Sequence, residues 1–234
     1  MQTIGLLGGL SWQSTQHYYR LINEGVAQQL GGLHSAQIAL WSVDFAPIEA
    51  LQHQERWEQA GALLAQAAQR IEAAGADFLL LCTNTMHITA GAIEAAIGIP
   101  LLHIADATAE RLRQRGIAAA GLLGTAFTME QPFYRERLAQ RGALRVLTPE
   151  PADRQSVHRI IYEELCLGVL REESRAEMQR IAAALQRAGA EALIAGCTEI
   201  SMLLQQRHTA LPLFDTTAIH AEAAVARALS PVRA

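Results

Sequence analysis

Residues 78–87 read FLLLCTNTMH, and residues 192–200 read ALIAGCTEI. Each stretch is a short apolar run that ends abruptly in Cys-Thr and a polar tail. Such a run, followed by a segment with helical periodicity, indicates a buried strand of a parallel sheet. Ligands of open α/β sheets bind just beyond the carboxyl ends of the strands. The two Cys-Thr turns therefore suggest one site that is built from two halves of the chain.

Strands and helices alternate along the rest of the chain, which is typical of an α/β protein with parallel sheets. Beside the two quoted runs, we expect strands at 3–7, 36–43, 101–104, 118–123, 145–148 and 211–214. We expect an irregular loop at 44–54, which contains Pro47.

The chain also contains an internal repeat. Gly5-Leu-Leu-Gly8 recurs at 121–124, and Cys82-Thr83 recurs at 197–198, so two landmarks repeat at nearly the same spacing. We therefore predict two similar α/β domains that face each other. The first covers 1–103 plus 211–234, because the last strand and helix return to it, and the second covers 104–210. The alternative is that short apolar strands simply resemble one another.

Composition and charge exclude several classes of protein. Half of the 234 residues are hydrophobic, which is enough for a substantial core, and the net charge of −4 without a basic tract argues against nucleic acid as a partner. No apolar run is long enough to span a membrane, and no signal peptide is evident, so we expect a cytoplasmic protein. Three cysteines in a reducing compartment indicate thiols, and no Cys/His cluster has metal-ligand spacing.

The position of the two Cys-Thr turns suggests their chemistry. Backbone N–H groups at a strand-to-helix turn favour negative charge, and this environment is expected to lower the pKa of a thiol toward neutrality. The same N–H groups could hold a substrate carboxylate. The segments 8–11 and 124–125 supply two further helix N-termini, so four turns suit a small carboxylate. The alternative is that either cysteine is a buried core residue.

The residues carry a resemblance to a known family over essentially the whole chain. The matching segments are TIGLLGGLSWQST at 3–15, TNTMH at 83–87, LLGTAFTME at 122–130, GCTEI at 196–200 and FDTTAIHAEAAV at 214–225. On these segments the chain resembles the aspartate/glutamate racemases, and most closely their bacterial L-aspartate/glutamate-specific subgroup. The resemblance implies two pseudo-symmetric α/β domains with the active site in the cleft between them. It further implies an amino-acid substrate, no pyridoxal phosphate or other cofactor, and a homodimer.

The family mechanism is a two-base proton transfer. One residue removes the α-proton from one face of the amino acid and another delivers a proton to the opposite face. Usually both are cysteines, in the motifs C-N-T-x-H and G-C-T. Alignment with the first motif here places Thr83 at the first catalytic position, with Cys82 one residue earlier. The resemblance therefore implies a Thr83/Cys197 pair, and a hydroxyl in place of a thiol predicts unequal turnover of the two enantiomers.

The resemblance and the turns also indicate supporting residues. Asn84, Thr85 and Thr198 are expected to donate hydrogen bonds to the substrate carboxylate. Leu10, Ser11 and Thr125 are expected to line the rim of the cleft. Glu199 could accept a proton or hold the substrate ammonium, or simply complement a helix dipole. His87 could have a function or lie on a helix surface. Asp215 and Thr216 begin the last helix, and Cys166 is interpreted as structural.

The group that holds the substrate side chain is not evident. Related aspartate racemases use basic residues here, but 44–54 contains no Arg or Lys, which leaves Gln52 and His53 as the polar candidates. A neutral amide holds a carboxylate less firmly than a guanidinium does, so uncharged polar amino acids are also possible substrates. Two other functions stay open: a single-cysteine decarboxylase of malonate-type acids and a non-catalytic amino-acid sensor.

Overall fold

A computed structural model describes residues 1–231, which form two compact units. The first unit consists of Met1–Ile104 and the chain from His220 onward, and the second of Ala105–Ile219. Each unit is built on a parallel sheet, so the predicted α/β class with two parallel sheets is confirmed. No helix within 1–231 is both long enough and apolar enough to cross a bilayer.

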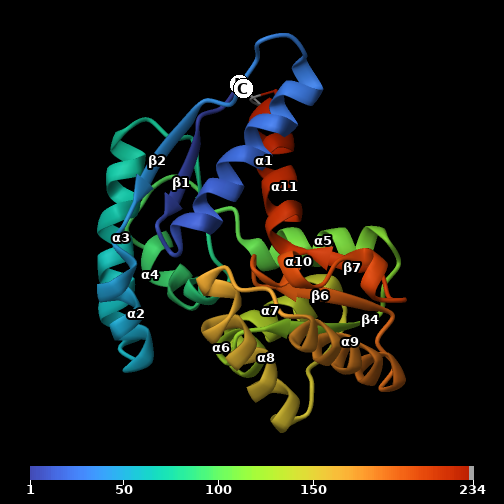
Figure 1. The fold of residues 1–234 in the computed structure, drawn as a ribbon. Helices are drawn as coiled ribbons and strands as arrows, with labels where there is room; N and C mark the ends of the chain where they lie inside the picture. Colours follow the sequence, from blue (N-terminus) through green and yellow to red (C-terminus); the bar gives the residue numbers. More distant parts are fainter. Residues whose placement is uncertain (232–234) are drawn as a thin grey trace. The chain divides into compact units, whose positions relative to one another are not determined.

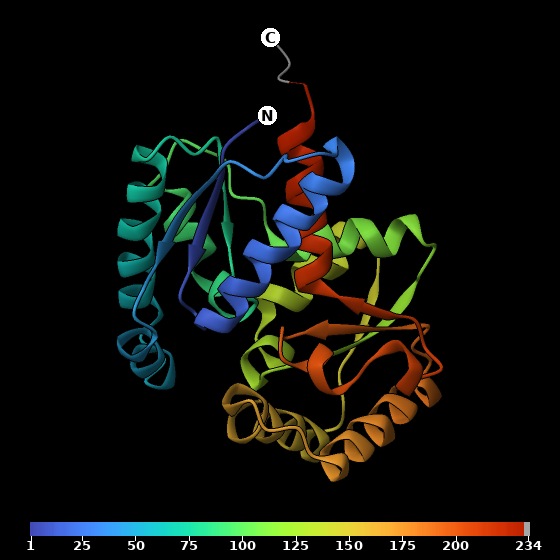
Figure 2. The same cartoon turned by 45° about the horizontal axis from the view of Figure 1, so that its top comes forward.

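The sheet of the first unit has three strands in the order β2-β1-β3. Its strands are β1 (Ile4–Gly8), β2 (Ile38–Ser42) and β3 (Phe78–Leu81). Helices α1 (Trp12–Leu30) and α11 (Thr216–Leu229) lie along one face (Figure 1, Figure 2). The other face is covered by α2 (Phe45–His53), α3 (Trp57–Ala73) and α4 (Ala90–Glu94), the last preceded by the 3-10 helix η1 (Thr85–Thr89).

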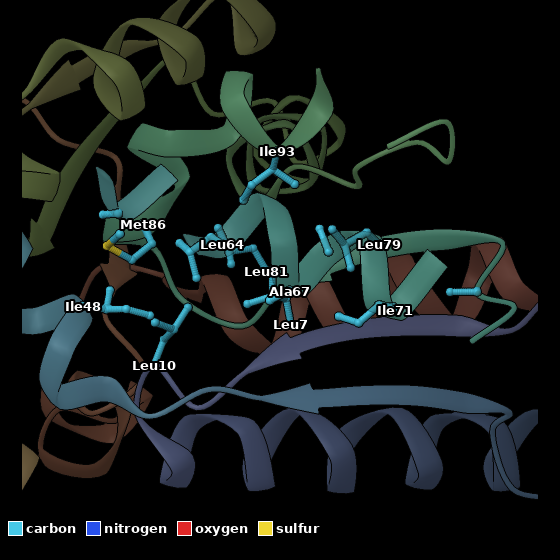
Figure 3. Close-up of a cluster of buried hydrophobic side chains, with 13 residues drawn as sticks. Leu7, Leu10, Ile48, Leu64, Ala67, Ile71, Leu79, Leu81, Met86 and Ile93 are labelled. Carbon is cyan, nitrogen blue, oxygen red and sulfur yellow. The ribbon is translucent and has the colours of Figure 1, made fainter. Parts of the chain in front are cut away.

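The core of this unit follows the alternation of side chains along a strand. Leu7, Leu79 and Leu81 point toward α2, α3 and α4, where Leu64 and Ile71 pack against them (Figure 3). The intervening residues point to the opposite side, and Cys82 continues that opposite set. Cys82 is completely buried beside Leu6 and Leu80 of the sheet. The same cluster contains four residues of α1 and α11: Tyr18, Ile22, Ala221 and Val225.

The sheet of the second unit has four strands in the order β5-β4-β6-β7. They are β4 (Ala119–Gly124), β5 (Arg145–Leu147), β6 (Ala192–Gly196) and β7 (Leu213–Asp215). The helices of this part are α5 (Ile104–Gln114), α6 (Ala126–Glu130), α7 (Pro132–Gly142), α8 (Pro151–Glu163), α9 (Glu172–Arg187) and α10 (Ile200–Leu203), with 3-10 helices η2 (Leu165–Leu167) and η3 (Gln206–His208).

The repeated glycines have the same structural role in both units. A Cβ at Gly5 of β1 would lie 2.6 Å from Cγ2 of Ile71 in α3. A Cβ at Gly121 of β4 would lie 2.8 Å from Cδ1 of Leu185 in α9. Each glycine therefore lets a helix pack directly on the central strand of its sheet.

Three expectations were wrong. The segment 44–54 is helical, because Asp44 caps α2 by accepting the N–H of Ala46 and Pro47 falls in the first turn, where no donor is lost. The last strand, β7, pairs with β6 and so belongs to the second sheet, whereas the end of α11 does return to the first unit. The expected strand at 101–104 is only an isolated bridge between Leu79 and Leu101.

Candidate active site

In the first unit, Thr83 lies just beyond the carboxyl end of β3, in a tightly bonded turn. Its N–H donates to the carbonyl of Leu81 at 2.8 Å. The preceding carbonyl, of Cys82, accepts from the hydroxyl of Ser14 at 3.2 Å, and the carbonyl of Thr83 itself lies 2.7 Å from Nδ1 of His87. The backbone on both sides of Thr83 is therefore held by side chains, while Thr83 is half-buried.

The residues predicted at the rim of the cleft and around the substrate carboxylate in the first unit lie at the same edge of the sheet, where β1 and β3 end. Leu10 is buried beside Met86 and Ile48 (Figure 3), and Ser11 is the N-cap of α1. Asn84 and Thr85 directly follow Thr83, and both are buried. This edge brings Leu10 and Ser11, which follow β1, next to Thr83, Asn84 and Thr85, which follow β3, because the two strands are paired neighbours.

Gln52 and His53 differ sharply in their surroundings. Gln52 is 2% exposed on the buried side of α2. His53 is exposed and lies 2.7 Å from Glu49 on the surface of the same helix. Of the two candidates for a side-chain contact with substrate, only Gln52 is therefore buried.

In the second unit, Cys197 directly follows β6 and Thr125 directly follows β4. Gly124 and Gly196 are paired in the register of these two strands. Thr125 and Cys197, which directly follow them, therefore leave the sheet at neighbouring positions of the same edge. The hydroxyl of Thr125 caps α6 by accepting the N–H of Thr128. Thr198 lies 3.2 Å from Thr217, which follows β7, so three neighbouring strand ends contribute to this edge.

The thiol of Cys197 donates a hydrogen bond to Oε2 of Glu199 at 2.9 Å. Desolvation, followed by the negative charge of Glu199 and this hydrogen bond, raises the pKa of Cys197 well above its ordinary value. The expected lowering of the pKa is thus wrong. The reason is that the thiol is desolvated and in direct contact with a carboxylate, while α10 is only four residues long and offers a weak dipole.

The two remaining thiols also have raised pKa values, and the start of α11 is fixed by local hydrogen bonds. Burial raises the pKa of Cys82 far above its usual range. Burial and the nearby charge of Glu199 raise the pKa of Cys166, in η2, to about 12. Asp215 caps α11 by accepting the N–H of Thr217 at 2.8 Å, and Thr216 donates to the carbonyl of Ala195. In the part of the chain that the structure describes, no group of three His, Cys, Asp or Glu residues could hold a metal ion.

The strand registers show which residues of the two units are equivalent. Gly5 is the partner of Leu79 in β3, and the equivalent Gly121 is the partner of Leu193 in β6. Counting four residues on from each partner leads to Thr83 in one unit and to Cys197 in the other. The two Cys-Thr dipeptides are therefore out of step by one residue, and Cys82 corresponds to Gly196.

Two residues were missed or misjudged at the sequence level. His87 is 2% exposed, so the interpretation as a helix-surface residue is wrong, and its contact with Thr83 spans four residues of the motif. Ser14 donates to the carbonyl of Cys82. It lies in the matching segment 3–15, but no feature of the sequence predicts its contact with the turn after β3.

Comparison with known proteins agrees with this architecture. The model of the Asp/Glu/Hydantoin racemase family matches residues 7–224. A crystal structure of a candidate Asp/Glu racemase from Yersinia pestis is 53% identical, with a TM-score of 0.94 over 98% of this chain and 100% of that one. An aspartate racemase homologue from Pyrococcus horikoshii is 30% identical, with a TM-score of 0.86 over the same shares.

A curated relative is more distant. The broad specificity amino-acid racemase of Bacillus subtilis is 24% identical over 163 residues, which are 70% of each chain. The match of the family model covers most of the chain and includes both candidate edges. The chain therefore belongs to the Asp/Glu/hydantoin racemase family and is an isomerase of the racemase class.

Proposed function

We propose that the protein racemises a polar amino acid, aspartate or glutamate in the first instance, by proton transfer at Cα with Thr83 and Cys197 and without a cofactor. The observation that carries the proposal is the equivalence of the two positions. Counted from the central strand of each sheet, Thr83 and Cys197 occupy the same place beyond a strand end. A two-base racemase needs one proton-transferring group for each face of the substrate.

The proposed reaction uses the contacts of each half. Glu199 accepts the proton of Cys197, and the resulting thiolate removes the α-proton from one face. The hydroxyl of Thr83 passes its proton to the opposite face and regains one from water, while Glu199 releases its proton to water. In the reverse direction Thr83 accepts the α-proton as it passes its own to water, and the thiol of Cys197 protonates the other face. Charge that develops on the substrate carboxylate is stabilised by donors from Asn84, Thr85 and Thr198.

The proposed substrate range includes acidic and uncharged polar amino acids. Gln52 is buried and neutral, and we propose that it contacts the substrate side chain. An amide binds a carboxylate less strongly than a guanidinium fork does, so it discriminates weakly against polar, uncharged side chains. A panel of aspartate, glutamate, asparagine, glutamine and serine, assayed on the wild type and on Gln52→Ala, tests this assignment.

The central experiment is incubation of the purified protein with L-aspartate and L-glutamate in deuterated water, without pyridoxal phosphate. We expect deuterium at Cα together with the D-enantiomer. Cys197→Ala is expected to abolish both, while the matched control Cys82→Ala retains them, because Cys82 is enclosed in the core. Normal turnover in Cys197→Ala with loss in Cys82→Ala would contradict the proposal, and exchange without inversion would indicate a one-base reaction.

We also propose a homodimer, on the family resemblance alone. Light scattering coupled to gel filtration measures the mass directly, against 25.4 kDa for one chain. A mass of twice that value is expected, and a single-chain mass at assay concentration would refute the proposal.

A further inference from the structure

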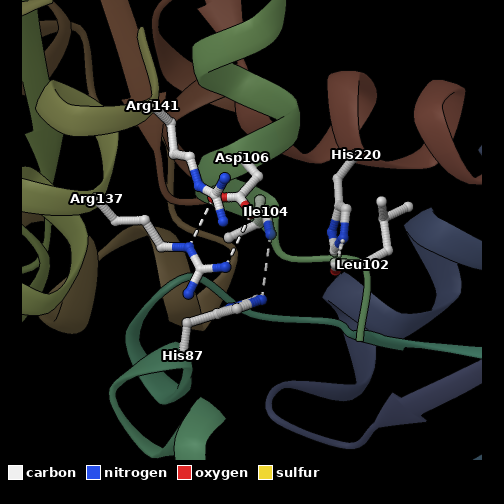
Figure 4. Close-up of polar contacts among 7 residues, drawn as sticks. All are labelled: His87, Leu102, Ile104, Asp106, Arg137, Arg141 and His220. Atoms are coloured by element: carbon white, nitrogen blue, oxygen red, sulfur yellow. Dashed lines mark hydrogen bonds and ion pairs between the residues drawn. The ribbon is translucent and has the colours of Figure 1, made fainter. Parts of the chain in front are cut away.

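The hydrogen bonds around His87 fix the tautomer of its ring. The backbone N–H of Ile104 points at Nε2 from 3.3 Å (Figure 4). A backbone N–H is always a donor, so Nε2 must be the acceptor and carries no proton. The proton of the neutral ring is then on Nδ1, which donates to the carbonyl of Thr83 at 2.7 Å.

Burial keeps this arrangement in place. His87 is 2% exposed, and its ring lies 4.4 Å from that of His103 and 6.0 Å from that of His220. Protonation of Nε2 would turn an acceptor into a second donor aimed at the N–H of Ile104, and this hydrogen bond would be lost. His87 is therefore a fixed donor to Thr83, and it connects the turn after β3 to the backbone of Ile104 in the same unit.

We propose that His87 is a positioning residue for the reaction, acting through Thr83. The inference rests on the proposed function, in which the Thr83 hydroxyl transfers a proton. Thr83 lies in a short turn in which its N–H donates to the carbonyl of Leu81, so a contact with its own carbonyl bears directly on where the residue lies. The donor at Nδ1 holds that carbonyl from one side, as the hydroxyl of Ser14 holds the preceding one. Misplacement of a reacting group by about 1 Å can lower a rate about a hundredfold.

Two substitutions separate the two hydrogen bonds of His87. In His87→Asn the amide nitrogen takes the place of Nδ1, so the bond to Thr83 is kept and the bond to Ile104 is lost. In His87→Gln the amide group takes the place of Nε2, so the bond to Ile104 is kept and the bond to Thr83 is lost. The chain itself shows the first geometry, because the amide of Asn23 donates to the carbonyl of Tyr19, four residues earlier, at 2.8 Å.

We expect kcat in His87→Gln to be lower than in His87→Asn by on the order of tenfold or more, because only the asparagine variant retains the donor to Thr83. KM should change less than kcat. Thermal unfolding of both variants shows whether they lose stability equally. A purely structural role predicts that kcat follows stability in both, and that result would overturn the proposal.

The kinetic isotope effect measured with α-deuterated substrate separates the two explanations, because a purely structural role of His87 would leave it unchanged. If Thr83 is misplaced, its own proton-transfer step limits the rate more strongly. In His87→Gln the isotope effect should therefore increase in the direction in which Thr83 removes the α-deuteron, and decrease in the other. An equal change in both directions, or none, would contradict the inference.

A measurement on the unmodified protein covers the case in which both variants unfold. Nitrogen-15 NMR of the full chain distinguishes the two neutral tautomers of histidine from the charged form. We expect the His87 ring to carry its proton on Nδ1, and a proton on Nε2 would refute the inference without any variant. If the wild type shows neither deuterium exchange nor inversion with any amino acid, the proposed function fails. If it racemises normally and the two variants behave alike, only the inference on His87 fails.

Discussion

At the scale of single residues, the contact between Cys197 and Glu199 affects how readily the thiol of Cys197 loses its proton. The carboxylate accepts the thiol proton, but its negative charge also raises the pKa of the sulfur. A thiol with a raised pKa is a weaker acid, so it holds its proton at neutral pH in these surroundings.

Replacing Glu199 by Gln removes the charge and is expected to lower the pKa of Cys197. The variant should be made in a Cys166→Ala background, because the exposed Cys166 would also react. The pH dependence of alkylation by iodoacetamide reports thiolate formation, and its midpoint should move to lower pH than in the same background with Glu199 intact. Glu199→Asp retains the charge and serves as the control. An unchanged or higher midpoint in Glu199→Gln would show that the carboxylate does not control the thiol.

A second residue-scale prediction concerns His220. Burial lowers the pKa of its ring from 6.5 to about 4, against a hydrogen bond to the carbonyl of Leu102 that raises it (Figure 4). Between these values the unfolded chain binds a proton that the folded chain does not. The free energy of unfolding should therefore fall as the pH decreases from 6.5 to 4, by about 3 kcal/mol from this residue.

Urea unfolding across this pH range tests the prediction with His220→Gln as the comparison. The glutamine cannot titrate, and its amide can still donate to Leu102. The variant should lose less stability than the wild type on acidification. Parallel curves for the two proteins would mean that His220 is not held neutral by its surroundings.

At the scale of elements, the central strands accept their helices through glycine. A Cβ at Gly5 would approach Ile71 at 2.6 Å and the backbone oxygen of Phe78 at 2.9 Å. Gly5→Ala is therefore expected to destabilise the protein by about 1–3 kcal/mol in urea unfolding. Gly91→Ala, in α4, is the matched control, because a Cβ there meets nothing within 4 Å and alanine favours a helix. Equal stability of the two variants would contradict the packing argument.

The sequence predicted elements better than their pairing. Apolar runs and turns identified β1, β3, β4 and β6 because buried parallel strands have a strong signal. Helix α2 was missed because Pro47 was interpreted as a breaker, although proline is tolerated in a first turn. Strand β7 was assigned to the wrong sheet because the local sequence of a strand does not indicate which strand it pairs with.

The candidate site was predictable in part for the same reason. The resemblance located the Thr83 and Cys197 positions, while the visible repeat of Cys-Thr pointed to Cys82 as the partner of Cys197. The strand register shows the same shift of one residue that the motif alignment implied. The contacts of Ser14 and His87 with the turn at Thr83 depend on how α1 and η1 pack, which a linear pattern does not contain.

At the scale of the whole molecule, two units repeat one plan: a glycine-containing central strand, a neighbouring strand, and a reactive position four residues beyond the partner of the glycine. The same plan carries different side chains, a hydroxyl in one unit and a thiol in the other, and the proposed reaction therefore predicts unequal turnover of the two enantiomers. This account depends on both side chains acting on one carbon atom.

A crystal structure of Cys197→Ser with bound L-aspartate tests that claim most directly. We predict that the hydroxyl oxygens at positions 83 and 197 lie on opposite faces of the substrate Cα, each about 3–3.5 Å away or linked to it through one water. A substrate bound with only one of these two positions near Cα, or with both on the same face, would contradict the two-base account.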